Sequence, residues 1–297
     1  MCGIVGLLLK NGALNARLGE LVTPMLASMS ERGPDSAGLA VFAEQDQGEK
    51  FSLFAADSEF DWDALKHALD DEALVGKPGI VSQGRYARLT LDVEPDTLKH
   101  WLGEHFPMLH VLSAGHYIDI YKDAGHPAAI AERYGFTGLT GSHAIGHTRM
   151  ATESAITPAH AHPFTAGEDF CLVHNGSLSN PYSIRRRLER RGIRFETDND
   201  TEAACRFIEW RLGEGETLED ALEEGFSVLD GFYTLLMGTH DKLALVRDPF
   251  ACKPAVVAET DDYVAIGSEY RALAHLPDVK NATLFEPKPE VIYSWNR

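Results

Sequence analysis

Cysteine is scarce in this sequence. The 297 residues contain four cysteines, at positions 2, 171, 205 and 252. No two of them have the CxxC spacing of a structural zinc site, so we expect no metal site. Four cysteines are also too few for a disulfide framework in a chain of this length. This favours a reducing compartment, and we expect a cytoplasmic protein.

Basic residues are outnumbered as well. The chain has 27 lysines and arginines against 45 aspartates and glutamates, a formal net charge of −18. This balance disfavours binding to nucleic-acid backbones or anionic membranes. The apolar run at 4–9 is too short to span a bilayer, and no basic segment precedes it as in a signal peptide. We therefore expect neither a nucleic acid nor a membrane as partner.

Nucleotide-binding motifs are absent too, since the sequence contains neither GxGxxG nor GxxxxGK[ST]. What it does contain is a series of short apolar strands with few helices between them. Strands are expected at 2–9, 36–42, 143–149, 170–174, 232–237, 242–246, 255–258 and 263–267. Helices are expected at 18–32, 181–191, 200–212 and 217–229. Because these helices are grouped rather than alternating with strands, the pattern indicates a layered α+β fold.

The section at about 43–141 has a different pattern and reads as a compact α+β unit of its own. Its expected strands are 51–55, 85–93 and 110–121, and its expected helices are 61–74, 95–103 and 127–134. We expect it either to lie at the rim of a functional pocket or dock a partner, or to act as a loop-rich decoration that stabilises the fold.

The first strand begins with Met1-Cys2-Gly3-Ile4. Removal of Met1 is expected before a small residue, and it would give Cys2 both a thiol and a free α-amine. A thiol has a pKa near 8.5 and an α-amine a pKa of about 7.7–8.0, so the amine can accept the thiol proton directly or through one water. Taken alone, Cys2 fits the more usual case of a buried, inert cysteine.

Several short polar motifs follow in a fixed order. They are Arg32-Gly33-Pro34-Asp35-Ser36-Ala37-Gly38, His147-Thr148-Arg149-Met150-Ala151-Thr152, Ala161-His162-Pro163-Phe164, His174-Asn175-Gly176-Ser177, Asp200-Thr201-Glu202, Arg247-Asp248-Pro249-Phe250-Ala251-Cys252-Lys253-Pro254 and Gly267-Ser268-Glu269. Together with the initial Met-Cys-Gly-Ile, this ordered set resembles the class II glutamine amidotransferases. The resemblance implies the four-layer αββα sandwich of N-terminal nucleophile hydrolases over 2–297, with the 43–141 section inserted.

The resemblance also implies roles for single residues. Cys2 would be the nucleophile that hydrolyses glutamine, and Asn175 and Gly176 would form the oxyanion hole. Arg149 would hold the substrate α-carboxylate and Asp200 its α-ammonium. Thr152 and His162 would line the glutamine pocket. Met150 departs from the aromatic residue that several family members have after the arginine.

Each of these residues also has a structural interpretation. Asn175-Gly176 is a strong hairpin-turn signal, and Asp200 could cap the helix that follows it. Arg149 could make an ion pair at a strand end, and His162 could shape a turn. Asp198 and His160 are close rivals of Asp200 and His162.

The segment His-Thr-Arg-Met-Ala-Thr-Glu most resembles the GlxB-type proteins, which are similar to the amidotransferase subunit of N-methylglutamate synthase. This implies separate partner subunits resembling the FMN and GXGXG parts of glutamate synthase. FMN and iron–sulfur groups would belong to the partners, and we expect no cofactor in this chain. Two other interpretations stay open: an N-terminal nucleophile amidase acting on a different amide, and a non-catalytic regulatory subunit.

Overall fold

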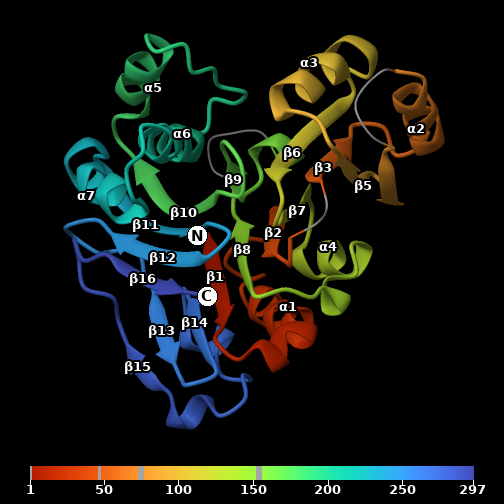
Figure 1. Cartoon of the computed structure of the whole chain (residues 1–297). Helices are drawn as coiled ribbons and strands as arrows, with labels where there is room; N and C mark the ends of the chain where they lie inside the picture. Colours follow the sequence, from red (N-terminus) through yellow and green to blue (C-terminus); the bar gives the residue numbers. More distant parts are fainter. Residues whose placement is uncertain (1, 46–47, 73–76, 152–155) are drawn as a thin grey trace.

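The computed structural model describes residues 2–45, 48–72, 77–151 and 156–297. These form three antiparallel sheets (Figure 1). In spatial order, the seven-stranded sheet consists of β15 (Thr283–Phe285), β13 (Val256–Glu259), β14 (Tyr263–Gly267), β1 (Gly3–Leu9), β8 (His143–Arg149), β2 (Ser36–Phe42) and β7 (Ile118–Ala124). The five-stranded sheet consists of β16 (Tyr293–Asn296), β12 (Lys242–Arg247), β11 (Gly231–Gly238), β10 (Cys171–Leu178) and β9 (Phe164–Thr165).

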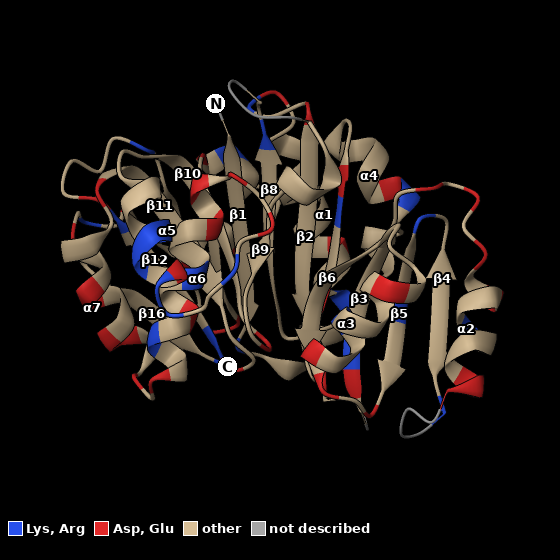
Figure 2. Ribbon diagram, turned by 90° about the horizontal axis from the view of Figure 1, so that it is seen from above, with Lys and Arg blue, Asp and Glu red and all other residues tan. Residues whose placement is uncertain are grey.

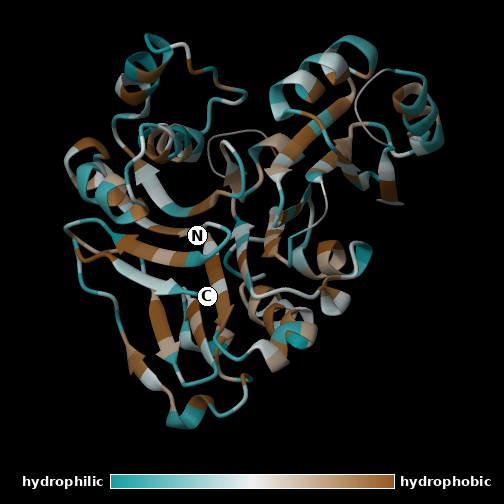
Figure 3. Cartoon of the chain, in the orientation of Figure 1, coloured by the Kyte–Doolittle hydropathy of each residue, from teal (hydrophilic) through white to brown (hydrophobic). Residues whose placement is uncertain are grey.

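These two sheets stack face to face and are covered by helices on their outer sides. The layer between them is apolar and includes Ile4, Ile145, Val173, Leu236 and Ile266, all fully buried. Helices α1 (Leu18–Ser28) and α4 (Pro127–Arg133) pack on the seven-stranded sheet. Helices α5 (Pro181–Glu189), α6 (Asp200–Gly213) and α7 (Leu218–Val228) lie beside the five-stranded sheet. Figure 3 shows the resulting hydrophobic strands between more polar helices. The predicted four-layer α+β sandwich is confirmed.

Strand β1 lies near the middle of its sheet because it can pair on both sides. All seven of its residues are buried, and it pairs with β14 on one edge and β8 on the other. Gly3 is required by close packing: a Cβ there would lie 2.8 Å from both Met29 Cβ and Thr148 Oγ1. This arrangement brings Cys2, before β1, next to Arg149, at the end of β8, since Gly3 pairs with Thr148.

The third sheet belongs to the middle section and has a core of its own. It consists of β4 (Gly79–Gln83), β5 (Tyr86–Leu91), β3 (Glu49–Ala55) and β6 (Leu109–Gly115), with α2 (Trp62–Asp71) and α3 (Pro95–His105) beside it. Its core includes Phe51, Leu53, Leu89 and Leu98, all fully buried.

The separately folded part of this section is shorter than the expected 43–141. The predicted strand 110–121 is two strands, β6 and β7, because the chain turns at Gly115, whose φ is +146°. Strand β7 pairs with β2 in the seven-stranded sheet, and α4 packs against α1, so both belong to the sandwich. The separate sheet therefore ends at Gly115. We refer to residues 49–115 as the insertion.

Short 3-10 turns complete the chain: Gly12–Arg17, Phe136–Gly138, Pro158–His160, Tyr270–Ala272 and Val279–Asn281. Across the described ranges, no helix has both the length and the apolar character needed to cross a membrane.

Candidate active site

A cleft of about 570 Å³ opens where β1, β8, β10 and the start of α6 meet. Five of the seven residues predicted for the site line it: Cys2, Arg149, His162, Gly176 and Asp200. Asn175 is buried immediately beside Gly176. Thr152 lies outside the described residues. Segments far apart in the sequence thus converge on one cleft.

The backbone of Cys2 is held by residues from two of the predicted motifs. Arg32 Nε donates a hydrogen bond to the Cys2 carbonyl oxygen at 2.9 Å, and its Nη1 pairs with Glu269 Oε1 at 2.6 Å. The next strand residue is fixed too, since the Ile4 N–H donates to Ser268 Oγ at 2.9 Å. The Arg-Gly-Pro-Asp and Gly-Ser-Glu motifs therefore position the N-terminal end of β1.

Arg149 is positioned by the turn that precedes β2. A Cβ on Gly33 would lie 2.4 Å from Arg149 N, so the two backbones touch and only glycine fits. The Asp35 N–H donates to the Arg149 carbonyl oxygen at 3.0 Å, and Asp35 Oδ2 accepts from the Ala151 N–H at 2.8 Å. Arg149 itself is 6% exposed and lines the cleft.

Asn175 and Gly176 lie within strand β10, where they pair with Thr234 and Tyr233, so the hairpin-turn interpretation is wrong. Gly176 has φ +145°, and a Cβ there would lie 1.8 Å from the Phe232 carbonyl oxygen. Asn175 is 3% exposed, and its Nδ2 has no hydrogen-bond partner among the described residues. A buried amide donor without a partner is rare, and it is what an anion-stabilising site requires.

Asp200 is the first residue of α6, and the helix cap is Asn199, whose Oδ1 accepts from the Thr201 N–H. The capping interpretation of Asp200 is therefore wrong. Its Oδ2 accepts from the Leu178 N–H at 2.9 Å, and its Oδ1 lies 3.7 Å from His174 Nδ1. Burial acts to raise the pKa of Asp200, but the His174 ring and the N–H groups of Leu178 and Thr201 outweigh it and lower the pKa to about 2.

The rivals of these residues lie at the edge of the same region. Asp198 also lines the cleft, but its side chain is 75% exposed and lies 3.0 Å from His160 Nε2. The Asp200 side chain is 25% exposed. His162 is 4% exposed, and the side chain of its rival His160 is 19% exposed. The geometry thus favours Asp200 and His162 as the more enclosed members of each pair.

Two histidines contact the Thr201 hydroxyl in the cleft, and a third packs behind them. His162 Nε2 lies 2.8 Å and His174 Nδ1 3.0 Å from Thr201 Oγ1, while the His147 ring stacks on His162 with centroids 4.0 Å apart. Burial lowers the pKa of His147 to about 3 and that of His162 well below its usual range. His147 and His162 are therefore neutral near pH 7. His162 forms part of the cleft wall, and His147 packs against it.

The loop before α6 is tied to the same helix. Glu202 accepts hydrogen bonds from the N–H groups of Glu196 and Thr197, both at 2.8 Å. Arg185 on α5 donates to the Thr197 and Asn199 carbonyl oxygens. Figure 2 shows this arginine-bearing helix beside α6. These contacts fix the approach to Asp200.

Sequence reasoning did not assign a role to several cleft residues, including His174, Thr201 and Lys253. All three stand in motifs that the sequence singles out, and this was the available signal. Lys253 is held through its carbonyl oxygen, which accepts from Thr234 Oγ1 and Arg247 Nη2, both at 2.9 Å. These two hydrogen bonds fix the backbone of Lys253, which lines the cleft.

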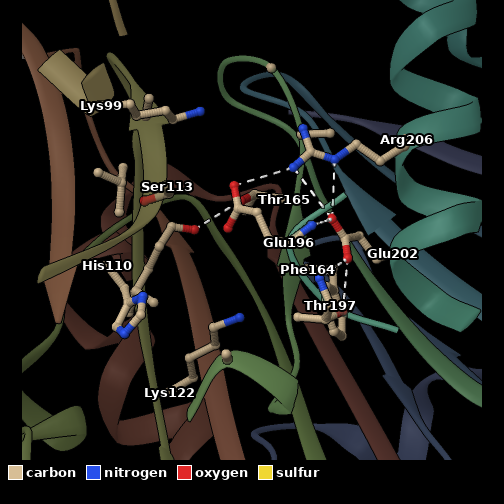
Figure 4. A pocket seen from close by; sticks show the side chains of 16 residues that line it. Lys99, His110, Ser113, Lys122, Phe164, Thr165, Glu196, Thr197, Glu202 and Arg206 are labelled. Atoms are coloured by element: carbon tan, nitrogen blue, oxygen red, sulfur yellow. Dashed lines mark hydrogen bonds and ion pairs between the residues drawn. The ribbon is translucent and has the colours of Figure 1, made fainter. Parts of the chain in front are cut away.

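A second cavity of about 60 Å³ lies between β6, β9 and the loop before α6 (Figure 4). Lys122, Glu196 and Glu202 are among its lining residues, and none of the predicted site residues lines it in the described part of the chain. Burial lowers the pKa of Lys122 to about 8, and its ammonium donates to the Ala161 and Pro163 carbonyl oxygens. Lys122 thus holds the backbone on either side of His162, which lines the cleft.

Comparison with known proteins identifies the class to which this fold and cleft belong. A model of the glutamine amidotransferase domain matches residues 147–275. The chain is 45% identical to the glutamine amidotransferase-like protein GlxB of Rhizobium meliloti, covering 100% of this chain and 98% of that protein. It is 33% identical to a putative glutamine amidotransferase of Methanothermobacter thermautotrophicus, covering 99% of each. The chain belongs to the glutamine amidotransferase family, and the predicted enzyme class is confirmed.

Solved structures agree on the fold. The glutamine phosphoribosylpyrophosphate amidotransferase of B. subtilis superposes with a TM-score of 0.62 at 19% identity, over 99% of this chain and 49% of that one. A structure described as the allosteric regulatory enzyme of purine biosynthesis gives a TM-score of 0.64 at 20% identity, over 99% and 47%. This chain spans about half the length of both.

Proposed function

We propose that this chain is a glutaminase subunit: it hydrolyses glutamine to glutamate and ammonia through a thioester on Cys2, and the ammonia passes to a separate synthase subunit. The observation that carries the proposal is the convergence of Cys2, Arg149, Gly176 and Asp200 on one cleft. Cys2 supplies a nucleophile and Gly176 an oxyanion donor, which amide hydrolysis uses, while Arg149 and Asp200 supply the charges that bind and orient a free amino acid.

Glutamine is held by its backbone groups in this proposal. The Arg149 guanidinium suits the α-carboxylate, because its planar fork can donate two parallel hydrogen bonds. The Asp200 carboxylate suits the α-ammonium, and its pKa of about 2 keeps it ionised throughout the physiological range. His162, neutral and buried, forms part of the pocket wall. Thr152 is proposed to complete the pocket.

The chemistry starts once Met1 has been removed. The α-amine of Cys2 accepts the thiol proton, and the sulfur attacks the Cδ carbonyl of glutamine. The oxyanion that forms accepts hydrogen bonds from Asn175 Nδ2 and the Gly176 N–H. The carbon–nitrogen bond then breaks, and the ammonium of Cys2 gives its proton to the departing ammonia. Water, deprotonated by the same amine, hydrolyses the thioester and releases glutamate.

The acceptor of ammonia is proposed to be a partner subunit resembling the FMN and GXGXG parts of glutamate synthase, in a cytoplasmic complex. Exposed aromatic side chains next to the oxyanion hole support a docking surface there. Phe232 is 50% and Phe250 72% exposed, and their rings lie 5.4 Å apart. The Phe232 carbonyl oxygen directly contacts Gly176.

Replacement of the nucleophile tests the proposal. Release of glutamate and ammonia from glutamine is measured for the wild type, Cys2→Ala and Cys252→Ala, alone and with the partner subunits. Cys2→Ala is expected to fold normally and lose at least about 1000-fold in kcat, because no other group can form the thioester. Cys252 is exposed and does not line the cleft, so its variant is expected to match the wild type. Wild-type-like hydrolysis by Cys2→Ala would refute the proposal.

A further inference from the structure

A second cluster of reactive side chains lies where the insertion meets the sandwich. Glu49 starts β3, His116 lies in the turn between β6 and β7, and Glu168 lies in the loop between β9 and β10. One potential ligand atom from each lies within 4.8 Å of the others. None of the three lines the cleft. The cluster therefore needs an explanation of its own.

The orientation of His116 leaves a lone pair facing a carboxylate. Its Nδ1 lies 3.1 Å from the Gly48 carbonyl oxygen, which can only accept, so Nδ1 carries the hydrogen. In the neutral ring Nε2 is then an acceptor, yet it lies 3.1 Å from Glu49 Oε2. Two acceptors at this distance repel unless a proton or a cation lies between them. A histidine that donates Nδ1–H to a backbone carbonyl is the usual geometry of a metal ligand bonded through Nε2.

Glu49 is buried without enough partners. Its side chain is 9% exposed, and its Oε1 accepts no hydrogen bond from the described residues. The nearby carboxylates of Glu168, Asp169 and Glu94 add negative charge around it. A buried carboxylate with an unsatisfied oxygen among like charges is costly, and a bound cation removes that cost.

The backbone segments that carry His116 and Glu168 are joined before any ion binds. Asp169 accepts hydrogen bonds from the N–H groups of His116, Tyr117 and Ile118, at 3.0, 2.8 and 3.0 Å. A Cβ on Gly115 would lie 2.3 Å from Asp169 Oδ1, so the turn closes onto this carboxylate only with glycine. The turn that carries His116 and the loop that carries Glu168 are thereby locked together.

We propose that Glu49, His116 and Glu168 bind one divalent transition-metal ion of the zinc type, which fastens the insertion to the sandwich. One imidazole and two carboxylates suit Zn²⁺, whose bonds to such ligands are about 2.0–2.2 Å, and the 3.1 Å between Nε2 and Oε2 is compatible with a shared ion. Water would complete the coordination. Glu168 is exposed and lines an open groove, which gives the ion a route in.

The test uses the full chain in the Cys2→Ala background, so that the cleft thiol does not compete for the metal. The protein is stripped with a chelator and titrated with Zn²⁺ by calorimetry, and its Tm is recorded with and without Zn²⁺. We expect one equivalent to bind and the Tm to rise. His116→Gln and Glu168→Gln are each expected to weaken binding at least tenfold.

The matched control is His240→Gln. His240 also lies beside a carboxylate, with Nδ1 3.9 Å from Asp241 Oδ1, but both are exposed and belong to no described three-ligand cluster. This variant is expected to bind Zn²⁺ like its parent. Glu168 is exposed, so its variant keeps the test informative if His116→Gln fails to fold. Absence of stoichiometric binding, or equal binding in Glu168→Gln and the parent, would overturn the proposal and leave an ordinary His116–Glu49 ion pair.

Discussion

The sandwich and the insertion differ in how they use long-range contacts. In the sandwich, β1 pairs with β8 and β14, which lie far along the chain. The end of β8 carries the buried Arg149, and β10 of the facing sheet carries the buried Asn175. In the insertion, the sheet pairs strands within 49–115 around an apolar core, and no residue described there lines the cleft. The comparison teaches that the sandwich builds the cleft, while the insertion is a locally folded addition whose described residues lie outside it.

The sharpest test of the sandwich half of this comparison is Asn175→Ala. The variant removes the buried Nδ2 of Asn175. This atom makes no hydrogen bond to the described residues, so none is lost with it. We expect kcat for glutamine hydrolysis to fall by about 100–1000-fold, because one oxyanion donor is lost. The Tm should change little. Asn281→Ala, at an exposed position, serves as the control. An unchanged kcat in Asn175→Ala would show that Asn175 has no part in the mechanism.

The second test compares one leucine from each region. Leu236 lies between the two sheets against Gly6 of β1, and Leu98 lies in the insertion core, and both are fully buried. Each Leu→Ala change is expected to cost about 2–5 kcal/mol of unfolding free energy. Because Leu236 supports the strand that follows Cys2, its variant should also lose about tenfold in kcat, whereas Leu98→Ala should keep kcat within about twofold. Equal losses of kcat would break the comparison.

The smallest effect concerns stability in acid. The pKa of Asp200 is lowered to about 2 in the folded protein from a usual value of 3.8, so its ionised form stabilises the fold by about 2 kcal/mol. This contribution is fully present above pH about 4 and is lost as the pH falls through about 2. Asp200→Asn should therefore show a smaller loss of unfolding free energy between pH 5 and 2 than the wild type, measured by urea unfolding.

The control for this measurement is Asp70→Asn, at an exposed position of α2 in the insertion. We expect its acid profile to follow that of the wild type. An Asp200→Asn profile that also coincides with the wild type would contradict the charge environment assigned to this carboxylate.

Apolar periodicity was enough to predict most elements of the sandwich. The strands at 36–42, 143–149 and 263–267 have the predicted bounds. Periodicity detects a strand by its buried apolar side chains. It therefore missed β4, whose residues are largely exposed. It also failed where a turn carries no proline or asparagine, as at Gly115-His116 between β6 and β7. The first helix ends at Ser28 rather than 32, since Met29–Gly33 turn to bring Gly33 against β8.

The order of the motifs singled out residues that the fold brings to one cleft, but local sequence could not choose between the functional and structural interpretations of each residue. Asn175-Gly176 has the composition of a turn, and only the pairing of β10 with β11 shows that its positive φ occurs within a strand. Among Asp198, Asn199 and Asp200, any could cap a helix, and only the folded chain assigns the cap to Asn199. The contacts of His162 and His174 with Thr201 join three segments, which no local pattern reports.

The most direct test of the central claim, that Cys2 with a free α-amine is the nucleophile, is covalent labelling. The protein is incubated with a glutamine analogue that carries a thiol-alkylating group in place of the side-chain amide, and the products are mapped by mass spectrometry. We predict a chain that begins at Cys2, a single adduct on that residue, and protection by excess glutamine. A retained Met1, an adduct on Cys252 instead, or labelling that glutamine does not slow would contradict the claim.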